Sequence, residues 1–236
     1  MVSQVLRPKK VKYDARKFTW LGRVFGSNNL IAVRRDSGVT TYDQATKNEV
    51  IMGSTGKGSP TFIVTSLANG LLGTKFKIVI GYRGMSGVYK ALDNKEADGF
   101  QSGWSSLAII RPDWHRQGRI VVLAANSLSP LPDEPSAPTF VDLVKDPRDK
   151  AIVTLISNND IIGRAWIAPP GIPKARLAAL RSSFKAMVNS PEAVAAAKKR
   201  KFDWKYVDWK PMQAHAAAIT GAKADLFDRA RMLLNK

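Results

Sequence analysis

The stretch "EVIMGSTGKGSPTFIVTSLANGLLG" (residues 49–73) joins a short apolar segment to a longer apolar segment through a turn with three glycines. Residues 49–53 predict a strand. Residues 59–73 predict a helix, with Ser59 as its N-cap and Pro60 in its first turn. A strand that leads through a glycine-rich turn into a helix is the repeating unit of α/β folds, so this stretch predicts a fold of that class.

The same alternation continues on both sides of this stretch. Strands are predicted over 29–35, 75–81, 97–101 and 119–124, and helices over 40–48, 85–95 and 104–114. Thr40 or Thr41 marks the start of the first of these helices. Residues 126–139 contain four prolines and predict a loop. The pattern indicates a mainly parallel sheet covered by helices on both faces.

The C-terminal third has a different composition. Residues 172–190, 191–201 and 210–236 are rich in alanine and have helical periodicity, and residues 163–171 predict a short extended crossing. No internal repeat is evident, and no apolar run reaches the roughly 20 residues that span a bilayer.

Composition excludes several kinds of site. The 236 residues include no cysteine, so disulfides, thiolate metal sites and cysteine nucleophiles are absent. The two histidines, His115 and His215, are a hundred residues apart and have no partner motif. We therefore expect them to be packing or surface residues, and we expect no metal and no cofactor.

The chain is strongly basic, with 37 Lys and Arg against 19 Asp and Glu and a formal net charge of +18. Such an excess favours an anionic partner: nucleic acid, acidic lipid or a small carboxylate. The basic residues are spread along the sequence rather than forming one block. For most of them the preferred interpretation is a solvated surface.

The turn after residue 53 is not a known nucleotide-binding loop. A Walker loop requires a hydroxyl residue directly after its lysine, and Lys57 is followed by Gly58. The G-x-G-x-x-G fingerprint is also absent. A helix N-terminus whose free amides attract an anion still fits, and so does a plain N-cap with glycines for turning, which the motif alone slightly favours.

A second turn of similar chemistry, "IGYRGMSG" (80–87), follows the next strand and opens the next helix. Turns that follow neighbouring parallel strands face the same edge of the sheet, where ligands usually bind. Arg83 either pairs with a carboxylate or lies in solvent. The candidate ligand-binding residues are Thr55, Gly56, Gly58, Ser59, Gly81, Tyr82, Arg83 and Gly84.

Seven blocks of the sequence resemble, in order and spacing, the substrate-binding receptors of tripartite tricarboxylate transporters. They are "FTWLGRV" (18–24), "RRDSGVTTYDQ" (34–44), "MGSTGKGS" (52–59), "IGYRGMSGVYKALDNKEADG" (80–99), "LPDEPSAPTF" (131–140), "GRAWIAPPGIPKARLAALRSSF" (163–184) and "SPEAV" (190–194). The resemblance implies a periplasmic-binding-protein-like fold of two lobes that close on a small organic carboxylate. It also implies a periplasmic location, no catalysis, no nucleic acid, and delivery of the ligand to membrane permease subunits. We expect a monomer.

On this resemblance, residues 34–162 form one lobe, while residues 1–33 and 163–236 contribute to the other. Both glycine-rich turns would line the ligand cleft. Family members carry a signal peptide and a first strand–loop–helix ahead of the block that begins at Phe18. We expect both to lie outside this chain, so the carboxylate loop of that segment is assigned to no residue here.

Three alternatives remain at this stage. The basic excess and the aromatics Trp204, Tyr206 and Trp209 favour a nucleic-acid or anionic-surface binder, although these aromatics equally suit a strand packed on helices. A ligand-sensing domain of a regulator is a further alternative, but no helix-turn-helix precedes it. Glu96 and Asp98 could form a catalytic carboxylate pair, but a helix end followed by a turn is the preferred interpretation.

Overall fold

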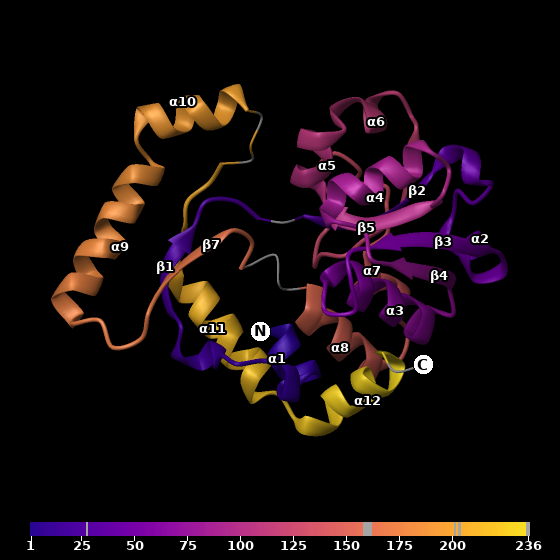
Figure 1. The fold of residues 1–236 in the computed structure, drawn as a ribbon. Coiled ribbons are helices and arrows are strands. Elements are labelled where there is room, and N and C mark those ends of the chain that lie inside the picture. Colours follow the sequence, from indigo (N-terminus) through magenta and orange to yellow (C-terminus); the bar gives the residue numbers. More distant parts are fainter. Residues whose placement is uncertain (27, 158–161, 201, 203, 235–236) are drawn as a thin grey trace. The chain divides into compact units, whose positions relative to one another are not determined.

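The computed structural model describes the whole chain except residues 27, 158–161, 201, 203 and 235–236. The chain divides into two compact units (Figure 1). Unit 1 contains Met1–Ser27 and Asn158–Ala224, and unit 2 contains Asn28–Ser157 and Asp225–Lys236.

Unit 2 is built on a five-stranded sheet in the order β4-β3-β5-β2-β6. Its strands are β2 (Asn29–Arg34), β3 (Glu49–Ser54), β4 (Lys75–Ile80), β5 (Gly99–Gly103) and β6 (Ile120–Ala125). The helices are α2 (Tyr42–Lys47), α3 (Pro60–Leu72), α4 (Gly84–Asp93), α5 (Trp104–Ile110), α6 (Pro112–Arg116), α7 (Phe140–Leu143), α8 (Pro147–Ser157) and α12 (Ala224–Leu234), with a 3₁₀ turn at Arg35–Ser37.

Helices cover both faces of this sheet. One face carries α4, α5 and α6, and the other carries α3, α7 and α8 (Figure 1). Under α4 lies a fully buried cluster in which the Tyr89 ring meets the rings of Phe100 and Trp114 edge-on, at 5.1 and 5.4 Å between centroids. Layers of helix, sheet and helix confirm the predicted α/β class.

The sheet is mixed rather than mainly parallel. β3 pairs in parallel with β4 and β5, but β2 runs antiparallel to both β5 and β6. β2 begins where β5 and β6 end, because Asn29 lies opposite Gly103 and Leu30 opposite Ala125. The chain therefore enters unit 2 at the carboxyl edge of the parallel strands, and its first strand must run against them.

Unit 1 has a three-stranded antiparallel sheet in the order β7-β1-β8. Its strands are β1 (Thr19–Arg23), β7 (Ala165–Ala168) and β8 (Val207–Asp208). Its helices are α1 (Val2–Leu6), α9 (Lys174–Val188), α10 (Pro191–Lys199) and α11 (Trp209–Gly221), with 3₁₀ turns at Pro8–Lys10 and Ala15–Lys17. Phe184 and Val188 of α9 pack on Leu21 and Val24, while Met212 and Ala216 of α11 pack on Trp20.

The units differ from the expected lobes, 1–33 with 163–236 and 34–162, at three places. Residues 158–162 are assigned to unit 1. Residues 28–33 belong to unit 2, because β2 pairs with β5 and β6. The last helix, α12, packs on α3: a Cβ at Gly70 would lie 2.7 Å from a methyl group of Leu233. In addition, Arg229 of α12 forms an ion pair with the buried Asp149 of α8.

Two expected helices are interrupted. Residues 104–114 form α5 and α6, because Pro112 keeps the preceding Arg111 out of the helical region, at φ −138°. Residues 210–234 form α11 and α12, with Ala222 extended between them. Residue 201 of the expected helix 191–201, and residues 235–236 of the expected helix 210–236, lie outside the described residues. No helix of the described residues combines the length and apolarity that crossing a bilayer needs.

Candidate functional site

The structure places the two glycine-rich turns side by side at one edge of unit 2. β3 and β4 are in parallel register from Glu49–Lys75 to Ser54–Ile80, so the turns leave the sheet at the same level. Gly81 and Tyr82 donate their N–H groups to the carbonyl oxygen of Ser54, at 3.1 and 3.4 Å. All eight candidate residues therefore lie at the carboxyl edge of these strands.

Thr61 organises the first turn. Its hydroxyl accepts the Thr55 N–H at 3.1 Å, lies 2.9 Å from the Ser54 hydroxyl and bonds the Ser59 hydroxyl. The Thr61 side chain is largely buried, and Ser54 is fully buried. Ser59 and Thr55 were predicted from the sequence as site residues, whereas Ser54 and Thr61 were not. The available signal was a pair of hydroxyl residues flanking the turn.

Ser59 is the N-cap of α3, as predicted, but its hydroxyl does not cap the helix. It donates instead to the carbonyl oxygen of Gly56 at 2.7 Å. Its backbone N–H donates to the same carbonyl at 3.0 Å. The side chain of Ser59 thus fixes the shape of the turn and leaves the N-terminus of α3 to other partners.

The backbone amides of the two turns fall into two groups. Those of Thr55, Gly56, Ser59, Gly81 and Tyr82 donate to protein acceptors. Within the described residues, the amides of Lys57, Gly58, Thr61, Arg83 and Gly84 donate no hydrogen bond to the chain. These five belong to, or directly precede, the first turns of α3 and α4, where the helix dipole favours negative charge.

Glycine is required at specific points of these turns. Gly81 and Gly84 have φ values of +112° and +69°, in the region that residues with a Cβ rarely adopt. Gly53 makes room for its neighbours, because a Cβ there would lie 2.9 Å from Val88 and 3.5 Å from the Tyr82 ring. The Tyr82 ring is thus held against β3, at the base of the second turn.

The electrostatics of this edge favour an anion. The two turns, residues 54–59 and 81–84, contain two basic residues and no acidic one. Lys57 and Arg83 are both exposed, one in each turn. The first turns of α3 and α4 contain no acidic side chain.

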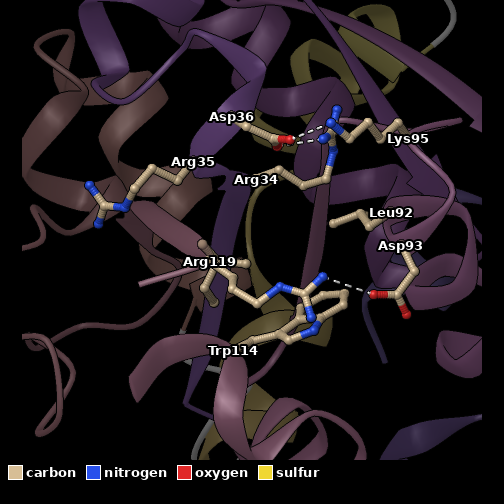
Figure 2. Close-up of a pocket in the computed structure, with 9 residues that line it drawn as sticks. Arg34, Arg35, Asp36, Leu92, Asp93, Lys95, Trp114 and Arg119 are labelled. Carbon is tan, nitrogen blue, oxygen red and sulfur yellow. Dashed lines mark hydrogen bonds and ion pairs between the residues drawn. The ribbon is translucent and has the colours of Figure 1, made fainter. Parts of the chain in front are cut away.

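The opposite edge of the same sheet is electrostatically different. A cavity of about 340 Å³ there is lined by Arg34, Arg35, Asp36, Leu92, Asp93, Lys95, Trp114, Arg119 and Ile120 (Figure 2). Asp36 pairs with Arg34 and Lys95, and Asp93 pairs with Arg119. Three of the four cations that line the cavity thus have carboxylate partners inside it, and the fourth, Arg35, donates to the carbonyl oxygen of Gly118.

The histidines and the carboxylate Asp98, which the sequence offered as possible ligands or catalytic groups, are packed against or bonded to other parts of the protein. His115 bonds Glu134 and lies edge-on to the Trp104 ring, at 4.9 Å between centroids. His215 is buried in unit 1, and burial lowers its pKa to about 4. Asp98 accepts from the Arg34 guanidinium and from the Ile51 N–H, both at 3.0 Å. Among the described residues, no group of three His, Cys, Asp or Glu could hold a metal ion.

The aromatic residues near the C-terminus are packed inside unit 1. Trp204 donates its indole N–H to the carbonyl oxygen of Val188 at 2.8 Å and packs in the cluster of Leu21 and Phe184, as does Tyr206. The Arg181 guanidinium covers the ring of Trp209, 3.5 Å from its centroid. Packed in this way, these rings do not form a stacking platform for bases.

Comparison with known proteins identifies the fold. No family model and no curated protein match the chain. Similar solved structures include a TctC solute-binding protein from Polaromonas, with 16% identity, TM-score 0.66, and coverage of 99% of this chain and 75% of that one. The periplasmic binding protein BugD has 19% identity, TM-score 0.64, and coverage of 90% and 69%. MatC from Rhodopseudomonas palustris, with bound malate, has 16% identity, TM-score 0.61, and coverage of 99% and 75%. The chain therefore has the α/β fold of solute-binding proteins.

Proposed function

We propose that this protein is a solute-binding receptor that captures a small di- or tricarboxylate or an acidic amino acid. In this proposal it passes the ligand to the membrane permease subunits of a tripartite tricarboxylate transporter. It works in the periplasm as a monomer, without a cofactor and without a catalytic step. The observation that carries the proposal is the set of free amides at two adjacent helix N-termini, in turns with exposed cations and no carboxylate.

The amides supply enough free energy for capture. A hydrogen bond to a charged group contributes about 1.5–3 kcal/mol net. Three such bonds, from among the amides of Lys57, Gly58, Thr61, Arg83 and Gly84, together with two helix N-termini, correspond to about −8 kcal/mol, or micromolar affinity. The malate bound in MatC, which shares this fold, agrees with a ligand of this class.

Arg83 and Lys90 provide a matched pair of variants that tests the proposal. Arg83 precedes α4 at the carboxyl edge, and Lys90 is exposed two turns further along the same helix. Isothermal titration with malate, succinate, citrate and glutamate should detect micromolar binding of at least one of them. Arg83→Gln should weaken this binding about five- to tenfold, whereas Lys90→Gln should change it less than twofold. Gly58→Val should also weaken it, because a side chain would stand where the ligand approaches the backbone.

The proposal fails under either of two results. One is that none of the four acids binds to a protein that gives a cooperative thermal transition. The other is that Arg83→Gln and Lys90→Gln weaken binding equally, because that would show a general charge effect rather than a site at the carboxyl edge.

A further inference from the structure

The positive charge of this protein is concentrated in unit 1. Counted from the sequence, unit 1 contains 19 basic and 5 acidic residues, a net charge of +14, whereas unit 2 contains 18 basic and 14 acidic residues, a net charge of +4. The proposed carboxylate site lies in unit 2, so capture of a small acid does not account for this asymmetry.

Helices α9 and α10 carry a large share of the excess. They contain Lys174, Arg176, Arg181, Lys185, Lys198 and Lys199, and Arg200 follows directly, against the single acid Glu192. Of the fifteen residues of α9, only Phe184 and Val188 are buried, and α10 buries only Ala197. Most of the surface of both helices is therefore accessible.

Within the described residues, these cations are not paired with carboxylates, unlike several guanidinium groups of unit 2. In unit 2 the guanidinium groups of Arg34, Arg111 and Arg229 are each paired with an aspartate. Within the described residues, Lys174, Arg176, Lys198, Lys199 and Arg200 form no ion pair. Unpaired, exposed cations are free to neutralise an external anionic surface.

Large apolar side chains are exposed on the same elements. Leu180 and Met187 of α9 are 38% and 43% exposed, and Val194 of α10 is 47% exposed. Trp166 of β7, whose ring lies 5.8 Å from that of Phe184 on α9, is 55% exposed. Cations mixed with exposed Trp, Leu and Met are typical of surfaces that bind the headgroup region of a membrane.

We infer that α9, α10 and β7 of unit 1 form a docking surface for anionic phospholipid headgroups. Nucleic acid fits this surface less well, because phosphate-backbone binding does not use exposed apolar residues, and Trp204 and Tyr206 are packed in unit 1. The inference does not depend on which acid unit 2 binds.

Vesicle sedimentation tests this inference with the full chain. Each basic residue near an anionic bilayer strengthens the attraction of the protein to its surface. Vesicles of phosphatidylcholine with 30% phosphatidylglycerol should therefore bind the protein at 50 mM salt, whereas vesicles of pure phosphatidylcholine should not. Binding should fall at least tenfold in Lys198→Gln/Lys199→Gln/Arg200→Gln. The matched control Lys90→Gln/Lys145→Gln/Lys150→Gln removes the same charge from exposed positions of unit 2 and should weaken binding less than threefold.

Trp166→Ser tests the apolar contribution to vesicle binding separately from the contribution of charge. This variant should lower binding to the anionic vesicles at 300 mM salt, where the charge contribution is screened. Circular dichroism and thermal melting establish that each variant is folded. Equal loss in the two triple variants would overturn the inference, as would equal binding to neutral vesicles. Retention of a 20-base-pair DNA duplex under conditions where anionic vesicles are not bound would overturn it in favour of nucleic acid.

Discussion

Replacing Thr61 by valine should unfold the first turn of the candidate site without changing the shape of the side chain. Valine keeps the β-branch of threonine but cannot accept the Thr55 N–H or bond the hydroxyls of Ser54 and Ser59. Each intramolecular hydrogen bond contributes about 0.5–1.5 kcal/mol net. The loss of three at a largely buried position should therefore lower the free energy of unfolding by about 2–3 kcal/mol.

Two variants serve as controls for Thr61→Val. Thr61→Ser keeps the hydroxyl and should lower the free energy of unfolding by less than about 1 kcal/mol. Thr65→Val, one turn further along α3, removes only the bond from the Thr65 hydroxyl to the Thr61 carbonyl, so it should cost about 1 kcal/mol. Urea unfolding followed by circular dichroism measures all three. If Thr61→Val lies within 0.5 kcal/mol of the wild type, or if Thr61→Ser is as unstable as Thr61→Val, the hydroxyl cluster does not hold the turn.

Two further predictions concern packing and pH. Gly99→Ala should lower the free energy of unfolding by about 1–3 kcal/mol in chemical denaturation, because its Cβ would lie 2.6 Å from the sulfur of Met52. The control Gly221→Ala, which has open space around it at the end of α11, should leave the stability unchanged or raise it slightly. Equal losses of stability in the two variants would contradict the close packing at Gly99. Burial, and secondarily the charged amino group of Met1, lower the pKa of His215 to about 4 in the folded protein, so the unfolded chain binds the proton first as the pH falls from 6.5. Stability should therefore fall below pH 6.5 by up to about 1.4 kcal/mol per pH unit, and His215→Gln should flatten this slope in urea titrations at pH 7, 6 and 5; an unchanged slope would contradict the assignment.

Local signals in the sequence were sufficient for the elements that form the site. The alternation around residues 49–73 correctly predicted β3, the turn and α3, because the apolar pattern and the position of Pro60 in the first turn of α3 agree there. At Thr41, the capping box with Gln44 likewise fixes the start of α2. The prediction that the two turns share one edge followed from the parallel pairing of β3 and β4.

Features that depend on distant parts of the chain could not be predicted. The direction of β2 depends on where the chain enters unit 2, and no residue within 29–34 encodes it. The net charge of +14 on unit 1 could be calculated only once residues 1–27 and 158–224 were known to form one compact unit, because the basic residues are dispersed along the sequence.

Amide chemical-shift mapping during a malate titration tests the central claim most directly. The account predicts that the largest ¹⁵N–¹H shift changes occur at Lys57, Gly58, Thr61, Arg83 and Gly84, which have free amides at the N-termini of α3 and α4. Changes concentrated around Arg34 and Arg119 at the opposite edge, or no changes at saturating malate, succinate, citrate and glutamate, would contradict it.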